Sequence, residues 1–347
     1  MDGLLGVFGS IQRWLFPALE EELGELNDKQ KEFVRVVELM DLPNYLLLFK
    51  WCGIGRKPLD RLCLLKSFVA KSVFGCPNTK CLLETLKGSP VVRRLCGWES
   101  VGMIPSEATF SRAFTQFADS ELPQRIHKGM VKKYLGAKLV GHISRDSTAI
   151  HAREKAVKKE KKEEAVKERR LALQPKRTLE ENLADIPKSC DWGAKYDSNG
   201  NKMRWRGYKL HIDTADGDVP VSAQLSSASV HDSQLGIPMA QLTAERVVNL
   251  YDLMDAAYDS PEIREFSTGL NHVPIIAHNR RRGEIKELEP ARKIRFRERS
   301  AAERVNSNLK DNYGGNNVRV RGYKKVFAHL MFGIIAITAN QLYNMLL

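Results

Sequence analysis

The sequence predicts a mixed α/β fold, in which an all-helical N-terminal region, residues 1–135, precedes a domain with a mixed five-stranded sheet, residues 136–347. Two observations carry this prediction. Residues 1–135 hold apolar side chains at helical spacing, whereas five later segments show the alternation or the short apolar run that is typical of strands. The chain's 347 residues suffice for one large domain and a smaller one.

Helices account for the N-terminal region. The clearest helix begins near Pro58, a residue type that is favoured in a first helical turn. Shorter helices are expected at about 81–86 and 91–95. Ser106 is suited to cap a further helix, which has an apolar face of phenylalanines. The polar face of that helix includes Arg112, and it fits either an ordinary solvent-exposed surface or a surface that contacts DNA.

Five strands are expected in the second region, the first three joined by hairpin connections and the others alternating with helices: 138–147, 206–213, 219–226, 247–254 and 273–277. Asp216 and Gly217 supply a turn between the second and third strands. A charged insertion, 153–205, interrupts the first hairpin. Its lysine- and glutamate-rich part, 155–170, has no apolar stripe and is expected to be a solvated helix or a mobile arm.

The chain ends in an apolar segment, and a packing helix is expected over 322–347. His329, Asn340, Gln341 and Asn344 interrupt the segment with polar groups that would be costly in lipid. We therefore expect a helix buried in the protein and no membrane partner. The six cysteines form no Cys-X-X-Cys pair, and no signal peptide is recognised, so a reducing cytoplasm is expected.

The net charge of +13 is unevenly distributed. Residues 1–57 carry 7 basic and 9 acidic side chains, a charge of −2, so the rest of the chain carries +15. Residues 280–325 alone hold 15 basic and 6 acidic side chains, a local charge of +9. Such a concentration of one sign fits a solvated basic face, but it favours a polyanionic partner, of which nucleic acid is the commonest.

Two acidic residues stand next to apolar strands. Asp146 ends the first expected strand, and Asp255 directly follows the fourth. Carboxylates at the ends of two buried strands can converge on one point, although either alone is more often a cap for the next turn. Converging carboxylates suit phosphodiester chemistry, in which two Mg²⁺ ions about 3.5–4 Å apart neutralise the phosphate and activate the nucleophile.

A third acid, Glu303, lies in a segment that is expected to be helical. Arg299, Glu303, Asn306 and Lys310 recur at offsets of four, three and four, so they share one helical face. An acid among cations suits a metal ligand with neighbours that grip phosphate, although surface ion pairs are the commoner explanation of such spacing.

At this point the sequence resembles a known family, in the family's order, over roughly residues 55–347. The resemblance is to the DDE transposases of bacterial insertion sequences, in the branch marked by Tyr-(2)-Arg-(3)-Glu-(6)-Lys. The same spacing occurs here as Phe296, two residues, Arg299, three residues, Glu303, six residues and Lys310. Phe296 replaces the tyrosine, which removes a hydroxyl but keeps the ring. Further matches lie at 144–150, 205–211, 231–233 and 254–260.

The resemblance implies a ribonuclease-H-like catalytic domain in which Asp146 bridges two Mg²⁺ ions, with Mn²⁺ able to substitute, while Asp255 and Glu303 each complete one. It implies that Arg299 and Lys310 hold DNA phosphates, and we add Phe296, Arg304 and Arg112 as candidate DNA contacts. The N-terminal helices resemble the family's region that recognises DNA ends. Similar enzymes act as homodimers on double-stranded DNA, both the terminal repeats of the element and its target, in the nucleoid of the bacterial cytoplasm.

Three neighbouring residues are given other roles. Asp232 is expected to cap a helix, Asp259 to belong to a turn, and His231 to be structural rather than a ligand. Two functions besides an active transposase are consistent with the chain: a structure-specific nuclease on the same fold, and a catalytically silent DNA-binding descendant. The three retained acids argue against the silent descendant.

Overall fold

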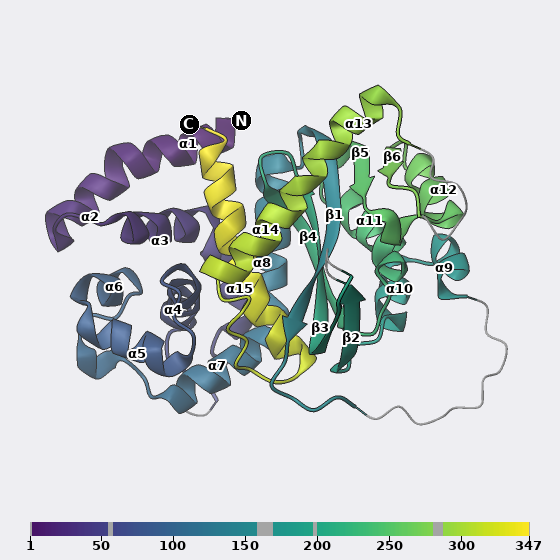
Figure 1. Ribbon diagram of the computed structural model, residues 1–347. Coiled ribbons are helices and arrows are strands. Elements are labelled where there is room, and N and C mark those ends of the chain that lie inside the picture. Colours follow the sequence, from purple (N-terminus) through teal and green to yellow (C-terminus); the bar gives the residue numbers. More distant parts are fainter. Residues whose placement is uncertain (1, 55–57, 158–168, 197–199, 280–286, 347) are drawn as a thin grey trace. The chain divides into compact units, whose positions relative to one another are not determined.

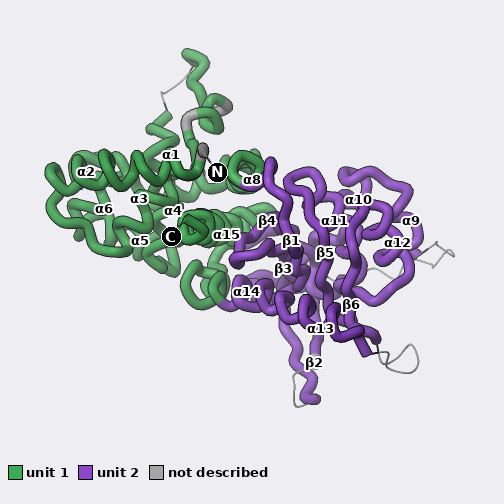
Figure 2. The backbone as a smooth tube through the Cα atoms, turned by 90° about the horizontal axis from the view of Figure 1, so that it is seen from above, with its two compact units in different colours: residues 1–134, 308–320, 324–347 green, residues 135–307, 321–323 purple. Residues whose placement is uncertain are grey.

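A computed structural model describes residues 2–54, 58–157, 169–196, 200–279 and 287–346 (Figure 1). The chain forms two compact units (Figure 2). Unit 1 comprises residues 1–134, 308–320 and 324–347, and unit 2 comprises residues 135–307 and 321–323. The sequence-based division ends its first region at almost the same residue, but it assigns the C-terminal helix to the second domain, whereas contacts group that helix with the N-terminal helices.

Unit 1 is helical, as expected for its N-terminal part. Its elements in chain order are α1 (Asp2–Ser10), the π-helix η1 (Ile11–Leu15), α2 (Phe16–Leu23), α3 (Asp28–Leu39), η2 (Leu42–Phe49), α4 (Arg61–Val73), α5 (Thr79–Gly88), α6 (Pro90–Leu95), η3 (Val101–Met103), α7 (Glu107–Asp119), α8 (Leu122–Leu135) and α15 (Tyr323–Asn344). Helix α4 starts three residues after Pro58, because the Asp60 carboxylate accepts the amide of Leu62 and caps it. Ser106 precedes α7, but its hydroxyl makes no capping bond to the backbone.

Helix α15 lies in the core of unit 1. It is the one helix of the described residues that is long and apolar enough to cross a membrane, and 89% of its apolar window is buried. The Phe332 ring packs against Phe68, with centroids 5.8 Å apart. The polar interruptions have partners inside the unit: His329 Nε2 lies 3.0 Å from the Gly314 carbonyl oxygen, and Asn340 Nδ2 donates to Glu32 at 2.9 Å. The helix therefore gives no indication of a membrane protein.

Unit 2 contains a mixed sheet of six strands, and all five expected strands are present. The order is β2-β3-β1-β5-β6, with β4 also paired to β3. The bounds are β1 (Leu139–His151), β2 (Asp191–Tyr196), β3 (Lys202–Ala215), β4 (Val219–Ser227), β5 (Val248–Met254) and β6 (Val273–Ile276). β1 pairs antiparallel to β3 and parallel to β5, and β5 pairs parallel to β6. This mixed α/β architecture after a helical region is consistent with the expected ribonuclease-H-like fold.

Two differences from the expected sheet concern its hairpin side. A sixth strand, β2, forms inside the charged insertion and pairs with the first part of β3, which therefore begins at Lys202 rather than at 206. β1 continues to His151, so Asp146 lies within the strand rather than at its end. The insertion also holds α9 (Arg170–Leu173), η4 (Gln174–Lys176) and α10 (Leu179–Asp185). Most of the charged run, 158–168, lies outside the described residues.

Gly207 joins the sheet to the pair of strands β2 and β3. It faces His151 on β1 and Asp191 on β2. Its φ is +153°, and a Cβ built on it would lie 2.1 Å from the Ile150 carbonyl oxygen. Both the backbone angle and the close approach require glycine.

Helices cover both faces of the sheet (Figure 1). The remaining elements of this part of the chain are η5 (Asp232–Leu235), α11 (Gly236–Ala244), η6 (Ala256–Tyr258), α12 (Pro261–Gly269), α13 (Pro290–Phe296), η8 (Arg297–Arg299) and α14 (Ser300–Asn312). Successive residues of a strand point to opposite faces. On β1, Ser144 contacts the Glu298 carbonyl of η8, whereas Arg145 bonds to Asp213, which also binds Thr243 of α11.

Candidate active site

Asp146 and Asp255 occupy corresponding positions on two neighbouring parallel strands. The β1–β5 register ends with Arg145 opposite Met254, and the next residue on each strand is one of the two acids. β5 stops there, and the Asp255 Oδ1 atom accepts the amide of Ala257 at 2.9 Å, which starts η6. β1 continues, with Asp146 opposite Ile212 of β3. The carboxyl ends of parallel strands are a common location for sites in α/β proteins.

The two carboxylates are held in an environment that disfavours their charge. Burial, together with the negative charges of Asp255 and Asp232, raises the pKa of Asp146 from 3.8 to about 6 against the opposing hydrogen bond from the Ser147 amide. Burial also raises the pKa of Asp255, again with a contribution from Asp232. A cluster of acids with raised pKa values is a signature of functional sites, because a bound cation would relieve the repulsion.

The α14 side of the sheet supplies one direct partner. Asn306 Nδ2 donates to Asp146 Oδ2 at 3.0 Å, and Ser144 Oγ donates to the Glu298 carbonyl at 2.9 Å, so this helical segment runs along β1. The Asn306 Oδ1 atom is buried and accepts no hydrogen bond from the described residues. A buried acceptor without a donor is costly unless water or an ion satisfies it.

Glu303 lies one helical turn before Asn306, on the same face of α14. Its carboxylate pairs with Arg299 in a short contact and is 54% exposed. The positive charge of Arg299 lowers the pKa of both Asp146 and Asp255. Within the ranges that the structure describes, no three His, Cys, Asp or Glu residues are grouped closely enough to hold a metal ion. The structure therefore brings Asp146 and Asp255 together and keeps Glu303 on Arg299.

Asp146, Asp255 and Asp232 form an acidic cluster, because the charge of Asp232 raises the pKa of the other two. The sequence analysis did not predict that Asp232 belongs to it. The cap of η5 is not Asp232 but His231, whose Nδ1 accepts the amide of Ser233 at 3.3 Å. The Asp232 carboxylate instead accepts Lys209 Nζ at 2.8 Å. Both His231 and Asp232 are able to cap a helix, so the sequence does not decide which of them does. The contact of Lys209 with Asp232 decides it in the structure. Asp259 does lie in a turn, where it accepts the amide of Asn279 at 2.9 Å.

The expected DNA contacts are dispersed. The Phe296 ring lies 5.7 Å from the Arg299 guanidinium, close to the acidic cluster. Arg304 is engaged in a two-pronged ion pair with Asp218, at 2.6 and 2.7 Å. Lys310 lies near the end of α14, and Arg112 on α7 donates to Thr109 at 3.1 Å. The roles of these residues in DNA binding stay predictions.

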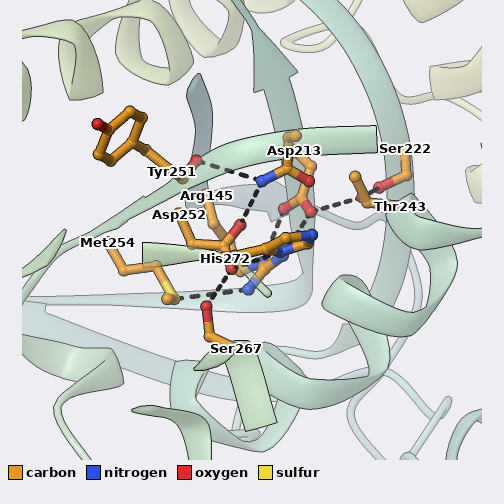
Figure 3. A network of polar contacts seen from close by, with 10 residues as sticks. Arg145, Asp213, Ser222, Thr243, Tyr251, Asp252, Met254, Ser267 and His272 are labelled. Carbon is orange, nitrogen blue, oxygen red and sulfur yellow. Dashed lines mark hydrogen bonds and ion pairs between the residues drawn. The ribbon is translucent and has the colours of Figure 1, made fainter. Parts of the chain in front are cut away.

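A separate buried network fills the opposite face of β1 (Figure 3). Arg145, 1% exposed, donates from Nε and Nη2 to the two oxygens of Asp213 at 2.8 and 2.6 Å. Thr243 also donates to Asp213, at 2.7 Å. Nearby, Asp252 accepts His272 at 3.1 Å, Asn249 at 3.0 Å and the Ser267 hydroxyl. These acids are fully partnered, so they hold the strands that carry Asp146 and Asp255 and are not available to a ligand.

Comparison with known proteins identifies the family. A family described as a transposase DDE domain matches residues 141–339, and a second, described as a transposase domain (DUF772), matches residues 21–116. No curated protein and no solved structure gave a match. The finer branch, with its Tyr-(2)-Arg-(3)-Glu-(6)-Lys spacing, stays a prediction. Because the DDE match spans more than half of the chain, and Asp146 on β1 lies next to Asp255 directly after β5, the chain belongs to the DDE transposases of insertion sequences, nucleases and strand transferases that act on DNA.

Proposed function

We propose that Asp146, Asp255 and Glu303 hold two Mg²⁺ ions, for which Mn²⁺ can substitute, and that the enzyme cuts DNA at the ends of its element and joins the freed 3′-OH to target DNA. The observation that carries the proposal is the pair of partly buried acids at neighbouring positions, Asp146 on β1 and Asp255 directly after β5, each with few partners among the described residues. DDE transposases in general depend on a divalent metal.

The residues fit a hard divalent cation. Carboxylate and amide oxygens are the ligands that Mg²⁺ prefers, and the site offers two partly buried carboxylates and the Asn306 Oδ1 atom, which has no hydrogen-bond partner among the described residues. Bound ions would supply charge neutralisation at the attacked phosphate and an activated oxygen nucleophile. Asn306 keeps the Asp146 carboxylate oriented toward α14, and Lys209 holds Asp232 next to the cluster.

Glu303 completes the site by exchanging partners. Glu303 is paired with Arg299. The positive charge of Arg299 lowers the pKa of Asp146 and Asp255, as a bound metal ion would. A DNA phosphate is a better partner for a guanidinium than a half-exposed carboxylate, because it can be bound by two parallel hydrogen bonds. DNA binding therefore draws Arg299 onto the phosphate and releases Glu303 toward Asp146. The DNA-bound enzyme is expected to be a homodimer that holds two element ends.

Neutral isosteric substitutions test the assignment. We expect Asp146→Asn, Asp255→Asn and Glu303→Gln each to lower Mg²⁺-dependent cleavage by about a thousandfold or more, since each removes a metal ligand worth several kcal/mol in the transition state. The matched control is Glu298→Gln, on the same helical segment, whose backbone carbonyl but not its carboxylate is engaged. The assay combines terminal-repeat DNA with a target plasmid and scores both cut and joined products.

The outcomes separate the alternatives. Full activity of Glu303→Gln would remove that residue from the site. Cleavage without any joined product would indicate a nuclease on this fold, and DNA binding without cleavage by the wild type would indicate a silent descendant.

A further inference from the structure

We propose that the ribbon, defined as β2 (Asp191–Tyr196) with residues 202–206 of β3, is a second DNA-contacting surface that grips the duplex about six base pairs from the cut phosphate. The inference rests on the proposed function, because it takes DNA as the substrate. None of the DNA contacts expected from the sequence lies on the ribbon, and the ribbon contributes no residue to the acidic cluster.

The register gives the ribbon two different faces. Trp192 lies opposite Arg206, Ala194 opposite Arg204 and Tyr196 opposite Lys202. Directly opposed residues of an antiparallel pair share a face. We call this the cationic face. The other face carries Asp191, Gly193, Lys195, Met203 and Trp205.

The two faces of the ribbon differ in how far their side chains are exposed. On the second face the Trp205 ring covers Gly193 so closely that a Cβ there would lie 2.4 Å from the ring, and Trp205 is 5% exposed. On the cationic face Trp192 is 57% exposed, and Arg204 and Lys202 are exposed as well. The second face thus buries Trp205 against Gly193, although Met203 farther along it is 51% exposed, and the cationic face leaves the Trp192 ring uncovered.

The charge of the exposed face selects the partner. Arg206, Arg204 and Lys202 are spaced two residues apart along one side of β3, with no acid among them. In the described part of the chain none of the three forms an ion pair, and the buried Nε of Arg206 has no hydrogen-bond partner. A row of cations beside an exposed tryptophan is complementary to a DNA backbone, because the cations bind phosphates and the indole packs on sugar or base.

The position of the ribbon fits DNA that is bound at the acidic cluster. Ile212 is opposite Asp146, and the cations occupy the even-numbered positions of β3, as Ile212 does, so they lie on the same side of the strand. Arg206 is six residues from Ile212, which corresponds to about 20 Å of strand, or about six base pairs of duplex. In Figure 2, β2 extends beyond the body of unit 2, as a ribbon that reaches along DNA would.

The salt dependence of binding tests the cationic face. Full-length protein carrying Glu303→Gln, which we expect to bind without cutting, is titrated with a fluorescein-labelled 30-base-pair duplex at several KCl concentrations. Each lost phosphate contact lowers the slope of log Kd against log [KCl] by about 0.9. We expect the double substitution Lys202→Ala and Arg204→Ala to lower the slope by about 2. Lys195→Ala, on the other face of the same ribbon, is the matched control and should leave the slope unchanged.

Trp192 gives an independent readout. Trp192→Ala should weaken binding about tenfold with an unchanged slope, since it removes packing and no charge, and Trp192→Phe should restore most of the affinity. A photo-crosslinker at position 192 should label the duplex about six base pairs from the cut phosphate.

The two proposals fail separately. If the double variant has the slope of Lys195→Ala, or if the crosslink falls at the cut phosphate itself, the ribbon is not the surface that we propose, whatever the wild-type cleavage assay shows. If wild-type protein fails to cut DNA while the ribbon variants still lower the slope, the catalytic assignment fails and the ribbon stands. Because the substituted side chains are exposed, unchanged thermal unfolding is expected for every variant.

Discussion

Unit 2 contains two pairs of carboxylates on opposite faces of its sheet, and their surroundings differ: Asp213 and Asp252 are buried, whereas Asp146 and Asp255 are partly exposed. Asp213 accepts three hydrogen bonds, from Arg145 and Thr243, and Asp252 is bonded by His272 and its neighbours. Among the described residues, Asp146 has one side-chain partner, Asn306, and Asp255 accepts the amide that starts the next turn and no other hydrogen bond. Although burial acts to raise it, the pKa of Asp252 is lowered by His272 and Arg145, whereas that of Asp146 is raised.

The difference teaches how a sheet can be both stable and reactive. A buried charge is tolerated where partners on the same chain satisfy it, and it is destabilising where they do not. Asp213 and Asp252 therefore strengthen the β1–β5 platform. Asp146 and Asp255 destabilise the platform by their mutual repulsion, and a bound cation would relieve that repulsion.

The largest expected effect comes from breaking the satisfied side. Arg145→Met leaves Asp213 and Asp252 without their cation, and we expect the free energy of unfolding to fall by about 3–5 kcal/mol, as measured by urea titration. In the same assay Asp146→Asn should be neutral or stabilising, because it removes a repelled charge. A loss of stability in Asp146→Asn as large as that in Arg145→Met would erase the distinction between the two pairs.

The pH dependence of metal-free protein sharpens the comparison. The pKa of Asp146 is about 6 in the folded chain against 3.8 in its ordinary state, so between these values the folded chain binds more protons. Its contribution makes the protein less stable as pH rises from about 4 to 6, by up to about 3 kcal/mol. Asp252 has a lowered pKa, so its contribution is present above 3.8 and is lost as pH falls below that value.

Urea titrations in EDTA at several pH values separate the two contributions. Asp146→Asn should remove the loss of stability between pH 4 and 6 and leave the acid limb that comes from Asp252. An unchanged profile in Asp146→Asn would show that this carboxyl is not the group under strain.

The smallest effect is the gain from the ligand itself. At a Mg²⁺ concentration a hundred times its Kd, binding to the folded state alone stabilises by about 2.7 kcal/mol. We expect Mg²⁺ to raise the unfolding temperature of the wild type and of Glu298→Gln, and to have no such effect on Asp146→Asn or Asp255→Asn. An equal rise in all four proteins would place the ions elsewhere.

The sequence was sufficient for much of this fold because its strongest signals are local. The strands that became β4 and β5 were visible as apolar or alternating runs, and Asp255 follows β5 as expected. The spacing of Arg299, Glu303 and Asn306 indicated one helical segment, and the structure adds that Asn306 donates to Asp146.

What escaped prediction depends on contacts that are distant in sequence. β2 contains Gly193 and Ala194, which have low strand propensity, so its conformation is decided by pairing with β3. The grouping of α15 with the N-terminal helices is likewise a property of packing, as is the presence of Asp232 in the acidic cluster. The pairing of Glu303 with Arg299 was also not predicted, because the spacing places both on one helical face without deciding which side chain each contacts.

Gly207 lies at the boundary between the ribbon and the part of the sheet that carries Asp146. It pins the ribbon to the sheet through a backbone geometry that tolerates no side chain, next to Ile150 and only four residues along β1 from Asp146. The strict requirement for glycine thus lies where β1, β2 and β3 meet and not on the cationic face, so substitutions on that face can change the proposed DNA contact without altering the backbone next to the acids.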